Sequence, residues 1–166
     1  MKRLITILAL TAAAAGCGGT TTSTKTVTVT PAAKSNEIAM FGYVKSLERK
    51  GSGYEMRFDP ALMLTGETAN VAAAEDGAIP IGQPVPNDNY VVDEGHRLLT
   101  YGVPANAHVT ALTKGVKGSP ITVAELAQLV RGENPFPKPL FEPISTGFWI
   151  RVDIDTARSL DQQYHP

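Results

Sequence analysis

The chain has 166 residues, in which 15 lysines and arginines face 16 aspartates and glutamates. This balance lacks the basic excess that contacts with phosphates require, so it argues against nucleic acid as a partner. Cys17 is the only cysteine, and an internal disulfide is therefore excluded. A folded domain in this chain must rely on its hydrophobic core.

The N-terminus has the layout of a secretory signal peptide. Lys2 and Arg3 precede an apolar run over residues 4–15 that is interrupted only by Thr6 and Thr11. A run of about twelve residues is shorter than the roughly 20 that a membrane-spanning helix requires. A positive start, a short apolar stretch and small residues before a cleavage position are typical of secretory signals.

The segment Ala14-Ala15-Gly16-Cys17 resembles the lipobox of bacterial lipoproteins, although Ala14 stands where leucine is usual. The resemblance implies that residues 1–16 are a signal peptide and that Cys17 carries a diacylglyceryl group with palmitate-like chains. Two acyl chains hold a protein at a bilayer, whereas one holds it only marginally. The expected location is the extracytoplasmic face of the cell membrane. The alternative is an ordinary secreted protein with a free thiol.

Residues 17–37 are interpreted as a threonine-rich tether, and Pro31 follows its last threonine. Such a composition buries too little apolar surface to offset the entropy of the chain. The tether is either a bare spacer or a carrier of O-linked sugars. Loss of residues 1–16 removes Lys2 and Arg3, which leaves 13 basic and 16 acidic residues and a net charge near −3.

Residues 38–166 are predicted to form one globular domain. Residues 38–47 and 54–59 read as two strands of a hairpin, and Pro60 is expected to end or bend the second. Thr65 is expected to cap a helix that runs to Asp76 and stops at Gly77. Residues 78–89 are irregular, and three more strands are predicted over 89–94, 98–103 and 108–112.

The second helix has the clearest local signal. Thr122-Val123-Ala124-Glu125 is a capping box, and the helix is expected to end at Gly132. Four prolines between residues 135 and 143 then force an extended crossing. Residues 148–154 alternate as a half-buried strand, with Ile154 among the inward positions, and a turn near Thr156 leads to a last strand.

The order ββ, helix, βββ, helix, ββ predicts an α+β fold. Two architectures fit it: a mostly antiparallel sheet, or a small, partly closed, OB-like barrel with two short helices. The segments 58–66, 86–92, 98–103 and 161–166 are similar to segments of small secreted or lipid-anchored bacterial proteins of unassigned function. That resemblance covers roughly residues 40–166. It implies an extracytoplasmic domain and assigns no catalytic residue.

Trp149, Arg151 and Tyr101 form the candidate binding surface. Trp149 falls on the polar side of its strand, next to Arg151. An outward tryptophan among polar neighbours is typical of a surface that binds a ligand or partner. The alternative is that Trp149 packs under a helix or under the proline-rich crossing.

Other residues carry the enzymatic alternative. Asp93 and His96 place a carboxylate near an imidazole, as a small hydrolase or a metal-dependent enzyme requires. Asp153, Asp155 and Asp161 bracket a turn and suggest calcium, but they lack the spacing of a calcium loop. We therefore predict no catalytic residue, no metal, no cofactor and no enzymatic activity.

The predicted function is that of a lipid-anchored, extracytoplasmic domain with a binding or structural role in the cell envelope. Its expected partners are the membrane, reached through Cys17, and an envelope protein, peptide or glycan. An envelope hydrolase or metal-dependent enzyme near Asp93 and His96 is one alternative. An accessory subunit of an envelope complex is another, and it would expose an apolar patch above roughly a few hundred Å².

Overall fold

The computed structural model describes residues 37–95 and 97–165. The predicted signal peptide with Cys17, residues 17–36 of the predicted tether, and His96 lie outside the described residues. All described residues belong to one compact unit, Lys34–Pro166.

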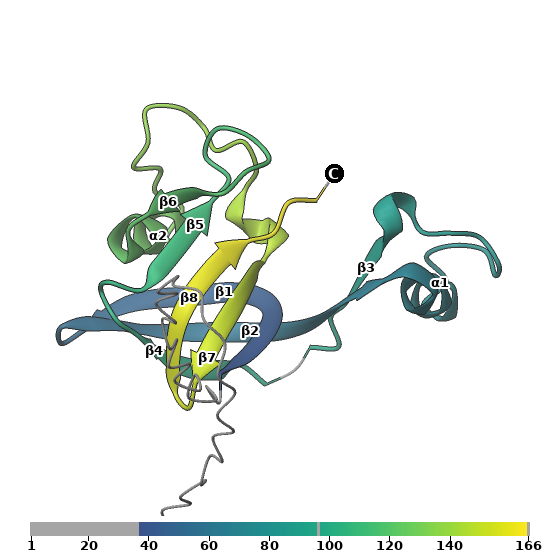
Figure 1. The fold of residues 1–166 in the computed structure, drawn as a ribbon, viewed down its shortest axis with the longest axis horizontal. Helices are drawn as coiled ribbons and strands as arrows, with labels where there is room; N and C mark the ends of the chain where they lie inside the picture. Colours follow the sequence, from purple (N-terminus) through teal and green to yellow (C-terminus); the bar gives the residue numbers. More distant parts are fainter. Residues whose placement is uncertain (1–36, 96, 166) are drawn as a thin grey trace, which may run out of the picture. The chain divides into compact units, whose positions relative to one another are not determined.

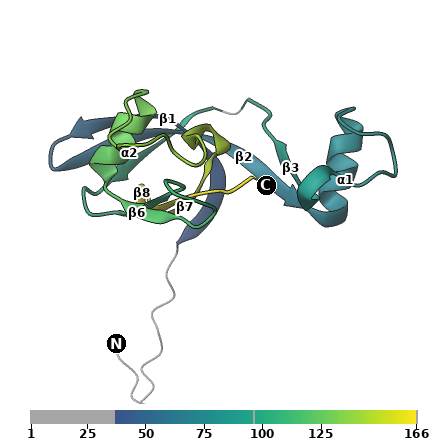
Figure 2. The ribbon, with the colours of Figure 1, turned by 90° about the horizontal axis from the view of Figure 1, so that it is seen from above.

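Five strands close into a mixed barrel (Figures 1 and 2). Around the barrel these strands are β1 (Ile38–Lys50), β2 (Gly53–Thr65), β4 (Leu99–Val103), β8 (Thr156–Gln162) and β7 (Phe148–Asp153). β7 pairs again with β1, which closes the circle. The contact of β4 with β8 is parallel and the other four are antiparallel. The α+β class and the OB-like barrel predicted from the sequence are confirmed.

Three further strands extend the barrel. β5 (His108–Ala111) pairs in parallel with β8, and β6 (Ser119–Ile121) pairs with β5 at the end of the sheet. β3 (Asn89–Val92) pairs with the C-terminal part of β2. The sequence pattern does not reveal β6 because Pro120 lies at its centre, a position that proline tolerates only in an edge strand.

Two helices cover apolar surface of different extent. α2 (Val123–Val130) buries Val123, Leu126 and Ala127 against the main core, which fills the barrel. α1 (Gly66–Glu75) lies on β2 and β3 over a much smaller core. Two short 3-10 helices, Pro86–Asp88 and Ile144–Thr146, complete the regular structure of the described residues.

The predicted capping box at the start of α2 is confirmed. The backbone N–H of Glu125 donates to Thr122 Oγ1 at 3.1 Å, and the backbone N–H of Thr122 donates to the Glu125 carboxylate at 2.7 Å. After the helix, Gly132 has a φ of +82°, a conformation that glycine adopts without strain.

The end of β2 and the place of Ile154 differ from the sequence-based expectation. Of the two alternatives for Pro60, an end or a bend, the end is wrong: β2 continues to Thr65, because the fixed φ of proline suits extended backbone and costs the strand only one donor. Ile154 does not face the core: it is 83% exposed and has a φ of +56°. The strand ends at Asp153, so Ile154 falls in the tight turn to β8 rather than in the alternation.

The buried side chain of Gln162 joins three segments. Its Oε1 accepts the N–H of Leu112 at 2.8 Å, and its Nε2 donates to the carbonyl oxygens of Pro143 at 2.9 Å and Glu142 at 3.3 Å. The N–H of Phe141 donates to the Leu112 carbonyl at 2.9 Å. These bonds hold the proline-rich crossing against the end of β5.

We expect Gln162→Glu to lower the free energy of unfolding by about 1–3 kcal/mol, because a carboxylate would face the carbonyl oxygens of Glu142 and Pro143 without a donor. Urea unfolding measures this change. Gln83→Glu, at an exposed position, is the matched control and should change stability by less than about 0.5 kcal/mol. Equal effects of the two substitutions would show that Gln162 does not hold the crossing.

Candidate functional site

Trp149 and Arg151 lie on the outer face of the barrel, but Tyr101 does not. In β7, Trp149 and Arg151 are exposed between buried neighbours. Tyr101 packs against the main core, and its hydroxyl lies 3.6 Å from Met40 Sδ. Tyr101 therefore occupies an inward position of β4, and the three residues do not form one surface.

The orientation of Trp149 is set by contacts on two sides. Its ring centroid lies 5.5 Å from that of Phe41, its partner across β1 and β7. Its Nε1 donates to Gln163 Oε1 at 3.0 Å. The indole is 38% exposed even so. Since its polar atom is bonded and its ring is supported, Trp149 presents an apolar surface without reorganisation.

Polar side chains surround Trp149 on the same outer face. Asp161 of β8 lies directly opposite Trp149, and Arg151 follows two positions along β7. On β5, Thr110 Oγ1 donates to Asp161 Oδ1 at 2.8 Å, and His108 Nε2 lies 3.7 Å from the same oxygen. We call these five residues the Trp149 face. It combines one aromatic plane with donors and acceptors on three adjacent strands.

Ser159 adjoins the Trp149 face without forming a nucleophile–base pair. It lies opposite His108 in the pairing of β5 with β8, and it is buried. Among the described residues its Oγ has no hydrogen-bond partner, while the imidazole of His108 faces Asp161. A serine hydroxyl is activated by a base within hydrogen-bond reach. Within the described part of the chain, Ser159 is not paired in this way with His108.

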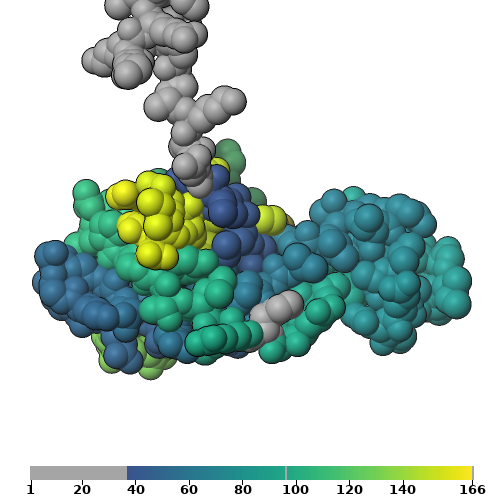
Figure 3. Space-filling view, turned by 90° about the horizontal axis from the view of Figure 1, so that it is seen from below, coloured from purple at the N-terminus to yellow at the C-terminus, as the bar shows by residue number. Residues whose placement is uncertain are grey.

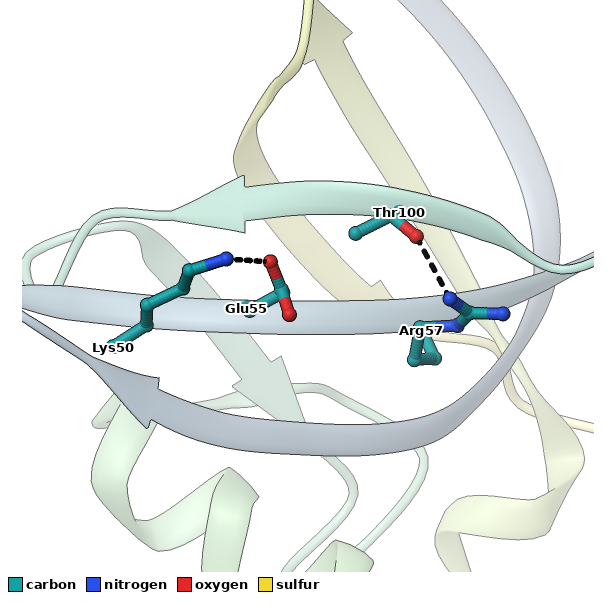
Figure 4. A network of polar contacts seen from close by, with 4 residues as sticks. All are labelled: Lys50, Glu55, Arg57 and Thr100. Carbon is teal, nitrogen blue, oxygen red and sulfur yellow. Dashed lines mark hydrogen bonds and ion pairs between the residues drawn. The ribbon is translucent and has the colours of Figure 1, made fainter.

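The surface between β2 and β4 is the one that OB barrels commonly use for oligonucleotides and oligosaccharides. Here it carries paired polar side chains (Figure 4). Lys50 forms an ion pair with Glu55, and Arg57 donates to Thr100 Oγ1 at 3.2 Å. Stacking requires exposed rings. The aromatic residues of these two strands instead pack in or against the barrel core: Tyr54, Phe58 and Tyr101.

Asp93, one half of the enzymatic alternative, lines a hollow of about 420 Å³ together with Tyr43 and Lys45. His96, the other half, lies outside the described residues. Lys45 Nζ contacts Asp59 Oδ2 at 3.0 Å, and Asp59 is 7% exposed. Asp59 Oδ1 has no hydrogen-bond partner within the described part of the chain.

The protonation of Tyr43 and Lys45 does not suit general-base chemistry. The hydrogen bond to Asp59 raises the pKa of Lys45, and burial raises the pKa of Tyr43, with repulsion from Asp93 as the second cause. Both side chains therefore keep their protons at neutral pH. A general base needs a pKa near the working pH.

The three aspartates of the calcium alternative have separate partners. Asp153 lies 3.6 Å from Arg158, and Asp161 belongs to the Trp149 face. The main-chain oxygen of Asp155 accepts the N–H of Gly102 at 2.9 Å. In residues 37–95 and 97–165, no group of three or more histidines, cysteines, aspartates or glutamates is placed to hold a metal ion.

A larger hollow, of about 770 Å³, lies between β6 and the proline-rich crossing. Sequence reasoning missed it because its walls come from segments that are far apart in the chain. The only local signal was Phe136 and Phe141 among the prolines of a segment predicted to be a plain connection.

No helix within the described part of the chain has both the length and the apolar character needed to cross a bilayer. No protein-family model, curated protein or solved structure matches the chain.

We expect Asp59→Asn to lower the pKa of Lys45 toward its ordinary value of 10.5, since the hydrogen bond to Asp59 is the main cause of the shift. An NMR titration of the Lys45 amine measures this pKa. Because the folded-state pKa is raised, the associated stability is present below the ordinary value and disappears as the pH rises through the raised one. Asp88→Asn is the control, and a Lys45 pKa unaffected by Asp59→Asn would contradict the ion pair.

Proposed function

We propose that this protein is a lipid-anchored, extracytoplasmic binding module of a bacterial envelope, and that the Trp149 face binds an envelope glycan. The observation that carries this proposal is the fixed, partly exposed indole of Trp149 among hydrogen-bonding side chains. Such a surface loses little conformational freedom when a ligand binds.

A sugar ring fits the chemistry of the Trp149 face. One side of the ring presents C–H groups that cover an indole, and its rim presents hydroxyls that seek donors and acceptors. Neighbouring strands lie about 4.8 Å apart, and alternate residues of one strand about 7 Å apart. Asp161 and Arg151 are thus within reach of the hydroxyls of a ring stacked on Trp149.

The position of the Trp149 face supports the binding of a ligand near the tethered end of the domain. The domain begins with β1, in which Ala39 lies opposite Arg151. The chain that follows the proposed tether therefore enters at the sheet that carries the Trp149 face.

The anchor is tested by Cys17→Ser in a bacterial host. We expect this variant to incorporate no labelled fatty acid and to leave the membrane fraction, because the acyl chains attach to the sulfur of Cys17. Ala14→Leu restores the usual residue and is the control; it should incorporate label at least as well as the parent. Labelled Cys17→Ser protein would contradict the anchor.

Glycan binding is tested with insoluble peptidoglycan sacculi, which carry the protein down on centrifugation. Trp149→Ala should weaken this binding at least about tenfold, and Trp149→Phe should retain part of it because a flat ring remains. Arg151→Ala should also weaken binding, because it removes a donor beside Trp149. Its matched control is Arg57→Ala, on the β2–β4 surface, which should bind like the parent. Since Trp149 is the only tryptophan, soluble glycan strands should also change the intrinsic fluorescence.

Equal binding of the parent and Trp149→Ala to sacculi would refute the role of this face. A parent that neither binds sacculi nor changes its fluorescence with soluble glycan strands would refute a peptidoglycan ligand.

A further inference from the structure

Two apolar surfaces of the domain carry opposite charges that lack partners. The first, which we call the basic groove, is the hollow of about 770 Å³ between β6 and the proline-rich crossing; its charged residues are Lys114 and Lys138. The second, which we call the acidic tip, lines a hollow of about 420 Å³ on α1 and the loop after it; its charged residues are Glu67 and Glu75. None of the four belongs to an ion pair among the described residues.

The basic groove is mostly apolar, and one of its walls is held by hydrogen bonds. Phe136, Phe141 and Ile121 line it together with three prolines: Pro120, Pro137 and Pro139. The crossing that forms one wall is held by the bond from the Phe141 N–H to the Leu112 carbonyl and by the Gln162 side chain. Phe141 is nevertheless 49% exposed. A preformed apolar groove with a few polar groups is the usual form of a binding site.

The edge strand beside the groove does not favour an added strand. Pro120, at the centre of β6, lies opposite Thr110 of β5 and has no N–H to offer on the free side. Without that donor, a ligand gains little from main-chain pairing. Recognition in the groove must therefore depend on side chains, that is, on apolar contact and charge.

The acidic tip presents an apolar side chain on a fixed turn. Ile81 is 91% exposed. It lies in a turn that is closed by a hydrogen bond of 3.1 Å from the Gln83 N–H to the Pro80 carbonyl. Val71 of α1, which lines the same hollow, is 48% exposed. Asn70 Oδ1 accepts the N–H of Val85 at 2.8 Å and ties the loop back to the helix.

The groove and the tip of one copy do not meet. Figures 1 and 2 place α1 and β6 on opposite sides of the barrel. Figure 3 shows the segments around α1 and β3 gathered at one end of the view, away from β8. The acidic tip can reach a basic groove only on another copy.

We propose that the basic groove of one copy receives the acidic tip of a second copy. Ile81 enters between Phe136 and Phe141, and Glu67 and Glu75 lie against Lys114 and Lys138. The contact joins two different surfaces, so each pair of copies leaves one groove and one tip open. Such head-to-tail contacts continue into a chain or close into a ring. The apolar contact supplies most of the affinity, and the charges select the orientation.

The test mixes tagged and untagged copies of the full chain and measures how much untagged protein the tagged protein captures. The tip variant is Ile81→Asp, which keeps its groove; the groove variant is Lys114→Glu with Lys138→Glu, which keeps its tip. We expect capture in the parent–parent and tip–groove mixtures. In the tip–tip and groove–groove mixtures, we expect capture to be at least about tenfold lower.

Two controls distinguish this contact from non-specific association. Ile154→Asp removes a similarly exposed isoleucine from the β7–β8 turn, outside both surfaces, and should capture like the parent. Copies that carry Glu67→Lys and Glu75→Lys together with Lys114→Glu and Lys138→Glu have both surfaces reversed in charge, so they should capture one another but not the parent. Circular dichroism checks that each variant is folded, as expected for exposed positions.

Equal capture in all four mixtures, or no capture between parent copies, would overturn the proposal. Loss of capture in Ile154→Asp, or absence of the charge-reversal rescue, would overturn it as well. The contact uses no residue of the Trp149 face, so binding to sacculi should be unchanged in the tip and groove variants. Failure here is therefore distinguishable from failure of the proposed function.

Discussion

The position of the proline-rich crossing depends on the buried amide of Gln162. A segment with so many prolines has few backbone donors of its own, so it cannot be held by a regular ladder. The amide solves this problem because it accepts from Leu112 and donates to the carbonyls of Glu142 and Pro143 at the same time. Breaking one of these bonds destabilises the fold by more than the net energy of that bond, because it leaves polar groups unpaired in the interior.

The same end of β8 also sets the outer face. Gln163 follows Gln162 directly; its N–H donates to the Gly147 carbonyl at 3.0 Å, and its Oε1 accepts from Trp149. Gly147 has a φ of +94°, and a Cβ at this position would lie 2.6 Å from the ring of Phe41. Any larger residue would therefore displace the Phe41 ring that supports the indole of Trp149. Two consecutive glutamines thus hold one wall of the basic groove and the orientation of Trp149.

Local patterns predicted several elements of the barrel, although most contacts of the fold join segments that are far apart in the chain. Alternation located the inward residues of β7, and the box at Thr122 located α2, since both signals act within one element. Tyr101 was predicted to lie on the outer surface but faces the core. The inward face of β4 is set by its pairing with β2, and the residues next to Tyr101 in the sequence do not reveal it. The groove was invisible for a similar reason: its walls, residues 113–121 and 136–141, are separate in the chain, and they are joined by the Phe141 bond to Leu112 and by the Gln162 side chain, which no sequence spacing predicts.

The acidic tip lies on the part of the domain that has the smaller hydrophobic core. Ala69, Ala73 and Val85 are its buried apolar residues, whereas the barrel buries several large side chains. Regions with few buried apolar contacts open more readily than the global fold. A contact made by such a region stabilises it by mass action when the partner binds only the ordered form. Anchoring through Cys17, as proposed, would confine copies to a surface and raise their effective concentration, which favours weak contacts between neighbours while the Trp149 face stays free for glycan.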